Sequence, residues 1–215
     1  MTAAQAPRIH ILAGVNGAGK SSIGGAAIRQ SGAYYFNPDE AARRLMAANS
    51  GLNLRDANSV AWEEGRRLLK RAIQERLNFA FETTLGASTM TNLLIQAADA
   101  GFELHVWYAG LASPELHIER VQLRVRHGGH DIPEADIRRR YRTSRLNLIR
   151  LLPRLASLHL YDNSIDADPA IGQLPVPRLL LHLDQGMLRG PKDLSATPVW
   201  AKPIVAVALK LSSGA

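Results

Sequence analysis

The sequence predicts an α/β fold in which a mostly parallel sheet is flanked by helices. Two observations carry this prediction. Apolar segments of strand length alternate with helical segments, and the first of them, 8–13, leads through a glycine-rich turn into a helix. With 215 residues, 46% of them hydrophobic, the chain has the size of one α/β domain. We therefore predict a single domain over 1–215, with a helical lid at about 115–150 and a C-terminal extension at about 185–215.

Short apolar segments are expected as strands at 8–13, 34–36, 79–83, 102–108, 158–162 and 178–184, the last two being the final strands of the sheet. Helices are expected from about Lys20, after 37–40, over about 56–77, from about Ser88 to Ala100, from 113–115 to the glycines at 128–129, and from 131–134 to about Leu152. Pro114 suits a first helical position, and Ser88 is expected to cap its helix. The residues after 184 show no clear pattern.

Composition limits the class of ligand. The formal net charge of +7 and the sequence pI of about 10.1 favour a polyanion, such as a nucleotide, over a cation. There is no cysteine, which excludes disulfides, thiolate nucleophiles and cysteine zinc sites. No apolar run approaches the ~20 residues that span a bilayer, and no signal peptide is recognised at the start. We expect a soluble, cytoplasmic protein with no membrane partner.

Residues 14–21, Gly-Val-Asn-Gly-Ala-Gly-Lys-Ser, match G-x-x-x-x-G-K-[ST] at every fixed position. Glycines let the backbone curl around an anion, and the helix that follows adds its positive end. In this motif Lys20 reaches the β- and γ-phosphates and the Ser21 hydroxyl binds Mg²⁺. The expected ligand is ATP or GTP with Mg²⁺ in a P-loop NTPase fold. The expected nucleotide-binding residues of this loop are Gly14, Asn16, Gly17, Ala18, Gly19, Lys20, Ser21 and Ser22.

The strand at 79–83 does not end in a Walker B aspartate but in Phe81-Glu82-Thr83-Thr84. This absence argues against a motor or transporter ATPase and for a small kinase. Glu82 is expected at the carboxyl end of its strand, where open α/β sheets bind their ligands.

The chain resembles the zeta-toxin-like P-loop kinases over roughly residues 8–162, and within them the bacterial chromosomal branch. The resemblance rests on the phosphate loop, on Phe36-Asn-Pro-Asp-Glu40, Phe81-Glu-Thr-Thr-Leu85, Ile118-Glu-Arg120, and on Gly128-Gly-His-Asp-Ile-Pro-Glu134 with the arginine-rich helix after it. It implies a nucleoside-kinase-like sheet with a central first strand and an arginine-rich helical lid. It also implies γ-phosphoryl transfer from ATP to the 3′-hydroxyl of the UDP-N-acetylglucosamine sugar, and a separate antitoxin protein as partner.

The resemblance implies roles for individual residues. Asp39 stands at the position of the catalytic base, and its place at a helix start, on the same sheet edge as the phosphate loop, suits that role. Lys20 and Arg120 complete the catalytic set. Glu82 and Thr84 belong to the substrate side of the pocket.

The region from Glu115 to Arg150 holds nine arginines and five acids, and planar guanidinium groups suit phosphate oxygens. A second lid arginine of the family falls on His130 here, so we expect His130 to face the substrate. The positive charge of that missing arginine is then expected from another residue of the lid. We expect it from Arg124, as a nucleotide-binding residue, or alternatively from Arg126 or Arg138.

One departure concerns the acceptor. The toxins carry a substrate-contacting acid at the position of Arg66, which puts UDP-N-acetylglucosamine in doubt far more than ATP. Two alternatives therefore stay open. One is a P-loop kinase that acts on another acceptor, namely a nucleoside, a metabolite or a nucleic-acid end, which the basic lid favours. The other is a nucleotide-dependent ATPase or binding switch.

Overall fold

The computed structural model describes residues 5–23, 33–165 and 176–214. Within these residues seven strands form one sheet: β1 (Arg8–Ala13), β2 (Tyr34–Phe36), β3 (Phe79–Thr83), β4 (Glu103–Gly110), β5 (Leu155–Asp162), β6 (Arg178–Asp184) and β7 (Met187–Gly190). The helices are α1 (Lys20–Ile23), α3 (Pro38–Ala48), α4 (Leu54–Gln74), α5 (Ser88–Asp99), α6 (Pro114–Arg126), α7 (Glu134–Leu151) and α8 (Lys202–Ser212), with a 3₁₀ turn, η1, at Leu152–Arg154.

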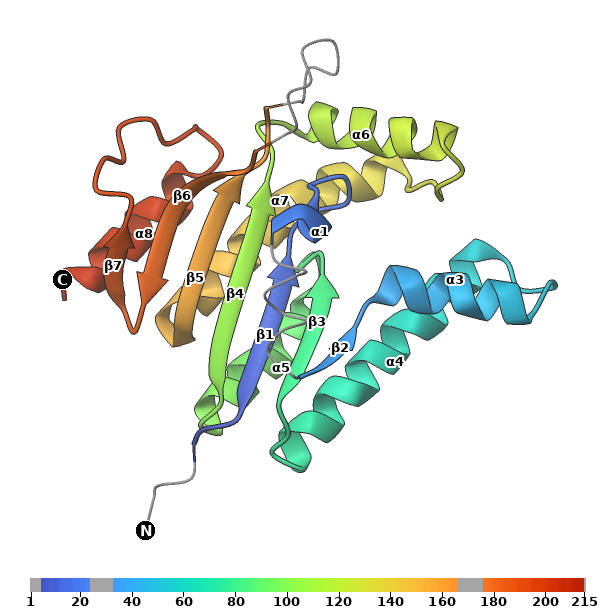
Figure 1. Cartoon of the computed structure of the whole chain (residues 1–215), viewed down its shortest axis with the longest axis horizontal. Helices are drawn as coiled ribbons and strands as arrows, with labels where there is room; N and C mark the ends of the chain where they lie inside the picture. Colours follow the sequence, from blue (N-terminus) through green and yellow to red (C-terminus); the bar gives the residue numbers. More distant parts are fainter. Residues whose placement is uncertain (1–4, 24–32, 166–175, 215) are drawn as a thin grey trace.

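The strand order is β2-β3-β1-β4-β5-β6-β7 (Figure 1). All pairs from β2 to β5 are parallel, and β6 and β7 add to the edge as antiparallel strands. Ala13, the last residue of β1, pairs with Thr83 of β3 on one side and with Tyr108 of β4 on the other. The carboxyl ends of these three strands therefore meet at one edge, where the phosphate loop begins.

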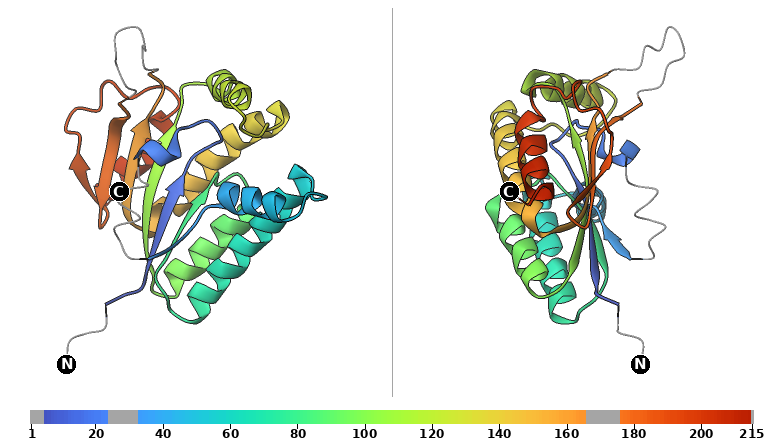
Figure 2. Two further views of the ribbon diagram at one scale, coloured as in Figure 1. Left: turned by 45° about the vertical axis from the view of Figure 1, so that its right-hand side comes forward. Right: turned by 90° about the vertical axis from the view of Figure 1, so that its left-hand side faces the viewer.

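The helices α4, α5, α7 and α8 lie in one layer against one face of the sheet, and α1 lies on the opposite side (Figure 2). Each helix of this layer packs against the next. The main core lies between layer and sheet, because alternate strand side chains point toward the helices. Ile9, Ile11, Phe81, Val106 and Leu158 are among its fully buried residues.

Capping side chains explain where two of the predicted helices begin. The Asn37 side chain caps α3 by accepting hydrogen bonds from the main-chain N–H groups of Asp39 and Glu40. Ser113 caps α6 in the same way through Leu116 N–H. The expectation for Ser88 is wrong: it is the first residue of α5, and Ala87 occupies the capping position without a side-chain bond. The helix therefore begins one residue earlier than a serine cap requires.

The C-terminal part contains two elements that were not expected, β7 and α8. Its anchor is Trp200, which is buried against Tyr108 with 6.4 Å between ring centroids and donates from Nε1 to Asp162 Oδ1 at 3.3 Å. The indole lies directly over Gly110, where a Cβ atom would stand 2.2 Å from the ring. The extension is thus packed onto the ends of β4 and β5. Among the described residues, no helix is both long enough and apolar enough to span a bilayer.

Three imidazoles have a lowered pKa: those of His10 and His159 are half-buried, and that of His117 is almost fully buried. His10 and His159 stack with other rings on the sheet face opposite the helix layer, and burial lowers the pKa of each to about 4. His117 of α6 is almost fully buried and donates from Nδ1 to the main-chain oxygen of Asn16 at 2.8 Å. Burial lowers its pKa to about 4 as well. All three imidazoles are uncharged at neutral pH.

The variant Gly110→Ala is expected to destabilise the protein by about 3 kcal/mol, because the new methyl group overlaps the Trp200 ring and either the ring or the strand must move. Urea unfolding followed by circular dichroism measures the effect. Gly51→Ala is the control, since its methyl group would meet only ordinary contacts at 3.5 Å. Equal stability of the two variants would show that Trp200 is not packed on β4.

The free energy of unfolding is expected to fall as the pH drops from 6.5 toward 4. The folded pKa of His117 lies below its unfolded value of 6.5, so the unfolded chain binds the proton first and acid favours unfolding. The shift corresponds to about 3 kcal/mol from His117, and His10 and His159 act in the same direction. Denaturant unfolding at several pH values tests this. His117→Gln should flatten the profile, whereas the exposed control His127→Gln should leave it unchanged.

Candidate functional site

The phosphate loop joins β1 to α1 through backbone conformations that favour glycine. Gly14 and Gly19 have φ angles of +143° and +75°. Each also touches a neighbour so closely that no side chain fits: a Cβ atom would lie 2.4 Å from the Ala109 oxygen at Gly14, and 2.3 Å from Asn163 Nδ2 at Gly19. The glycines that the motif predicted are therefore required by the surrounding structure.

Three other elements hold this loop from outside. Asn163, just after β5, donates from Nδ2 to the Ala18 main-chain oxygen at 3.0 Å. His117 of α6 holds the Asn16 main-chain oxygen as described above, and Gly14 N–H donates to the Thr83 oxygen of β3 at 3.2 Å. The loop is thus fixed before any ligand binds, as a site for a polyanion requires. The sequence did not point to His117 or Asn163 as supports.

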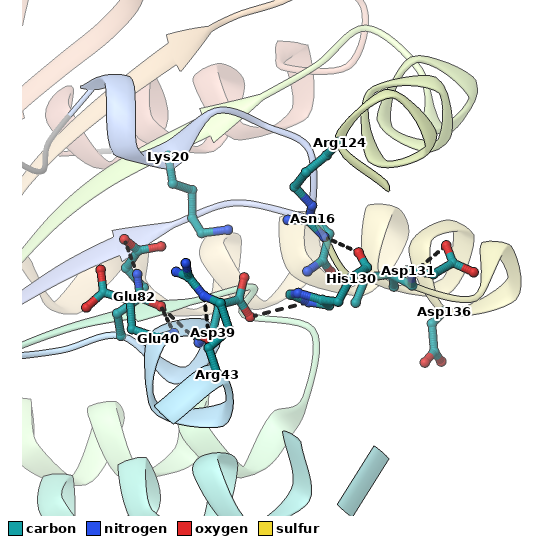
Figure 3. A network of polar contacts seen from close by, with 12 residues as sticks. Asn16, Lys20, Asp39, Glu40, Arg43, Glu82, Arg124, His130, Asp131 and Asp136 are labelled. Carbon is teal, nitrogen blue, oxygen red and sulfur yellow. Dashed lines mark hydrogen bonds and ion pairs between the residues drawn. The ribbon is translucent and has the colours of Figure 1, made fainter. Parts of the chain in front are cut away.

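Lys20 begins α1, and its Nζ donates to the Gly14 main-chain oxygen at 3.1 Å, so the ammonium group lies against the loop. Figure 3 shows this side chain reaching toward the side of the site where Asp39 and Glu82 lie. Ser21 and Ser22 follow in α1, but their side chains lie outside the part of the chain that the structure describes.

The opposite side of the site is built by β2, α3 and the end of β3. Glu82 Oε1 accepts hydrogen bonds from the Tyr35 hydroxyl and, at 3.1 Å, from Asn37 Nδ2. Since Asn37 also caps α3 through Oδ1, one side chain fixes both the helix that carries Asp39 and the Glu82 carboxylate. Within the described residues, both hydrogen bonds to Glu82 are made to Oε1.

A pocket of about 170 Å³ lies between these two sides. It brings together residues that the sequence singled out, Lys20, Asp39, Glu82 and Thr84, together with Asn16 of the phosphate loop. The other lining residues come from β2 and α3, from α4, from β3 and the loop after it, and from the start of α7: Phe36, Asn37, Pro38, Asn58, Trp62, Gly65, Phe81, Thr83, Gly86, Ala87, Met90, Ile132 and Arg140.

His130 reaches this site from the turn between α6 and α7. Its Nε2 lies 4.0 Å from Asp39 Oδ1 (Figure 3). Burial lowers the pKa of His130, and the nearby Asp39 carboxylate acts in the opposite direction. Arg124 donates from Nη2 to the His130 main-chain oxygen at 3.0 Å. Arg124 therefore holds the turn that carries His130.

The remaining arginines of α6 and α7 differ in where they lie. Arg120 lies next to the phosphate loop, since its Cβ is 3.4 Å from where a side chain at Gly17 would begin. Arg138 forms an exposed ion pair with Glu115 at 2.6 Å, and Arg126 lines a separate cavity between α6 and α7. Neither Arg126 nor Arg138 lines the pocket at Asp39.

Arg140 is the arginine of α7 that enters the pocket, and it is not among the site residues expected from the sequence. It donates from Nη1 to Asn16 Oδ1 at 2.8 Å, and Nη2 lies 3.6 Å from Asp136 Oδ2. Its stem passes over Gly86, where a Cβ would stand 2.7 Å from Arg140 Cγ. Burial lowers its pKa, which the Asp136 carboxylate opposes. Helical spacing is the sequence feature that could have identified it. Arg140 follows the buried Ile137 by three residues, so the two share the inward face of α7.

The α7 helix is fixed to the loop after β3 close to Arg140. Asn147 donates from Nδ2 to the Leu85 main-chain oxygen at 2.7 Å, and the Thr143 hydroxyl donates to the Gly86 oxygen at 2.9 Å. Leu85 itself has a φ of +49°, a conformation that such bonds support. The guanidinium of Arg140 therefore projects from a firmly packed part of the helix.

Arg66, the position that differed from the toxins, does not line the pocket. It pairs with Glu63, with 2.6 Å between Nη2 and Oε2. The wall that α4 presents to the pocket consists of Asn58, Trp62 and Gly65. The substitution at Arg66 therefore places no positive charge inside the pocket.

The site suits Mg²⁺ held jointly with phosphates rather than by protein alone. Among the residues with a described position, no group of three or more His, Asp or Glu side chains is arranged to hold a metal ion. Mg²⁺ in kinase sites keeps several waters and needs only one or two protein oxygens besides the phosphates. The glycine-rich phosphate loop beside the Asp39 and Glu82 carboxylates fits that requirement.

Comparison with known proteins gives the family. The zeta toxin family model matches residues 1–155. An uncharacterized protein of Haemophilus influenzae is 29% identical over 129 residues, which cover 60% of this chain and 88% of that protein.

Two solved structures have a similar fold. A chain of the AvrRxo1-ORF1:ORF2 complex with ATP superposes with a TM-score of 0.65 at 15% identity, covering 94% of this chain and 63% of that one. A chain of the PezAT chromosomal toxin–antitoxin system of Streptococcus pneumoniae superposes with a TM-score of 0.56 at 14% identity, covering 99% and 88%. These likenesses agree with a P-loop kinase fold. Since its model matches most of the sequence, the chain belongs to the zeta toxin family.

Proposed function

We propose that this protein is an ATP-dependent kinase that transfers the γ-phosphoryl group to a hydroxyl of a small molecule. The observation that carries the proposal is that Lys20 of the phosphate loop and the Asp39 and Glu82 carboxylates line one pocket. A phosphate cradle alone would suit any nucleotide-binding protein. A carboxylate at its open end, placed where an alcohol can approach, is what phosphoryl transfer requires.

In the proposed reaction the loop amides and Lys20 hold the triphosphate. The acceptor hydroxyl loses its proton to Asp39 as its oxygen forms a bond to the γ-phosphorus, and the bond from the γ-phosphorus to the β–γ bridging oxygen breaks to release ADP. Glu82 and Thr84 orient the acceptor. Ser21 and the phosphates, with Glu82 nearby, would hold Mg²⁺, which neutralises phosphate charge when bound.

Two arginines are proposed to balance the charge that develops in transfer. Arg120 lies beside Gly17 of the loop, and Arg140 lies in the pocket itself. Planar guanidinium groups bind phosphate oxygens in pairs, which an ammonium group cannot reproduce. The bond between Arg140 and Asn16 keeps this guanidinium near the phosphate loop before ATP arrives. The helices α6 and α7 would then act as the arginine-rich lid.

Membership of the zeta toxin family supports a UDP-activated amino sugar as acceptor and a separate antitoxin as partner. The PezAT structure is that of a toxin–antitoxin system, and AvrRxo1-ORF1 was crystallised with ORF2 and with ATP. A labelled-ATP transfer assay over nucleotide sugars, nucleosides and oligonucleotides tests the acceptor. Lys20→Ala is the blank. ATP hydrolysis with no labelled product would instead indicate a nucleotide-dependent switch.

Asp39→Asn is expected to bind ATP within about threefold of the wild-type Kd but to lose at least about 100-fold in phosphoryl transfer, because the amide cannot accept the hydroxyl proton. Calorimetry measures binding, and the transfer assay measures turnover. Glu40→Gln is a matched control on the same turn of α3, since Glu40 faces Arg44 rather than the pocket. Unchanged turnover of Asp39→Asn would remove Asp39 from the mechanism.

Arg140→Ala is expected to lower kcat by about 100-fold or more while the Kd of ADP stays within about threefold, because the lost guanidinium acts on the transferred group. Arg140→Lys should restore little of this loss. Arg139→Ala is the control, since Arg139 also pairs with Asp136 but does not line the pocket. Equal losses in the Arg139 and Arg140 variants would assign the effect to the fold of α7.

A further inference from the structure

The position of Asp39 is fixed through its main chain. Its N–H donates to Asn37 Oδ1 at 2.9 Å, and its carbonyl oxygen accepts from Arg43 Nε at 3.3 Å. Within the described residues, no hydrogen bond reaches the carboxylate itself, and His130 is the basic side chain that lies within 4.0 Å of it. These main-chain bonds therefore determine where Asp39 stands, but not which of its carboxylate oxygens faces the pocket.

The His130 imidazole approaches Asp39 from outside the pocket. Its Nε2 lies 4.0 Å from Asp39 Oδ1, and Figure 3 shows the ring turned toward this carboxylate. The same nitrogen is buried and, within the part of the chain that the structure describes, has no hydrogen-bond partner. Asp39 lines the pocket, whereas His130 does not. His130 is therefore placed to act through Asp39 rather than on a bound acceptor directly.

The turn between α6 and α7 holds His130 in this place. Arg124 donates to the His130 main-chain oxygen at 3.0 Å. Two residues further on, Ile132 is buried in a small apolar cluster with Val15 of the phosphate loop and Ile137 of α7. A shift of about 1 Å between this turn and α3 would bring Nε2 within hydrogen-bonding distance of Oδ1. Hydrogen bonds of this kind are often long without substrate and shorten when it binds.

The chemical state of the ring suits a donor. A buried N–H without a partner costs free energy, so Nε2 gains from meeting an acceptor. Burial lowers the pKa of His130, and the imidazole is therefore uncharged at neutral pH. An uncharged donor can orient a carboxylate without the full positive charge that would weaken that carboxylate as a proton acceptor.

We propose that His130 is a positioning residue for Asp39: when ATP and acceptor are bound, His130 Nε2–H donates to Asp39 Oδ1 and turns Oδ2 toward the acceptor hydroxyl. The proposal rests on the kinase function and on the role of Asp39 proposed above. His130 keeps its own proton. Oδ2 takes the proton of the acceptor hydroxyl as the hydroxyl oxygen forms its bond to the γ-phosphorus. The carboxylate is thus oriented when the α6–α7 turn lies against α3.

Three substitutions test the donor in the labelled-ATP transfer assay. His130→Ala is expected to lower kcat about tenfold or more, with the Kd of ATP within about threefold, because a hydrogen bond to a charged group is lost. His130→Gln should keep kcat within about threefold of the wild type, since the glutamine amide nitrogen can take the place of Nε2. His130→Asn should behave like His130→Ala, because its shorter side chain brings the amide to the place of Nδ1 instead.

His127→Ala is the matched control for these variants. His127 belongs to the same turn and is exposed, and its Nδ1 bonds to the Leu123 main-chain oxygen of its own helix. Its substitution should leave kcat unchanged. A loss equal to that of His130→Ala would assign the effect to the fold of the turn and would contradict the proposal.

The double variant Asp39→Asn/His130→Ala tests whether His130 acts through Asp39. Its transfer rate is expected to lie within about twofold of that of Asp39→Asn alone, because two residues that act as a unit lose their effect together. Losses that multiply would show that His130 acts independently of Asp39, and the proposed role would be wrong.

Nitrogen-15 NMR of the histidine side chains gives a readout that does not depend on turnover. With Mg²⁺ and a non-hydrolysable ATP analogue bound, the His130 ring is expected to be neutral with its proton on Nε2. The signal is assigned by its loss in His130→Ala. A neutral ring with its proton on Nδ1 would rule the proposal out, since Nε2 could not then donate to Asp39.

The outcomes distinguish this role from the kinase function. Full activity of His130→Ala beside lost activity of Asp39→Asn would overturn the role of His130 and leave the kinase function standing. Equal losses in His130→Gln and His130→Ala would do the same. If the wild-type protein binds ATP but transfers phosphate to no acceptor, the kinase function is overturned, and the role of His130 with it.

Discussion

The backbone of residues 14–19 is the constraint on which the rest of the site depends. This loop turns through conformations that favour glycine, and at Gly14 and Gly19 it lies too close to its neighbours for any side chain. It is bonded to β3, to α6 through His117 and to the end of β5 through Asn163. Elements from much of the sequence are therefore fixed relative to the loop. Their positions in turn determine the geometry of the pocket.

The division of charge across the pocket follows from the topology of the sheet. Lys20 begins the helix after β1, whereas Asp39 begins the helix after β2 and Glu82 ends β3. Because β2, β3 and β1 are parallel neighbours, these positions meet at one sheet edge. Lys20 lies on the phosphate-loop side of the pocket, and the Asp39 and Glu82 carboxylates lie on the other side. Asn37 links the two carboxylates, since it caps the helix of Asp39 and bonds Glu82.

The elements whose formation depends on neighbouring residues in the sequence were predicted correctly. The strands from β1 to β6 lie where apolar segments indicated them, and α3 and α6 begin where the sequence indicated helix starts. The elements β7 and α8 were missed because the C-terminal residues show no clear periodicity. Their anchor is the contact of Trp200 with Gly110, which lies 90 positions away (200 − 110) in the sequence. A contact between residues so far apart produces no periodic pattern in the local sequence.

The sequence by itself determined the phosphate loop and the meeting of Lys20 with Asp39 and Glu82, because glycine conformations, helix caps and parallel strand ends are local properties. Only the tertiary structure decided which of nine arginines between Glu115 and Arg150 enters the pocket. The rotation of α7 is set by bonds to the loop after β3 and by its buried face, and these turn Arg140 inward. The same holds for Trp62, since helix spacing shows which residues share a face but packing decides what that face meets.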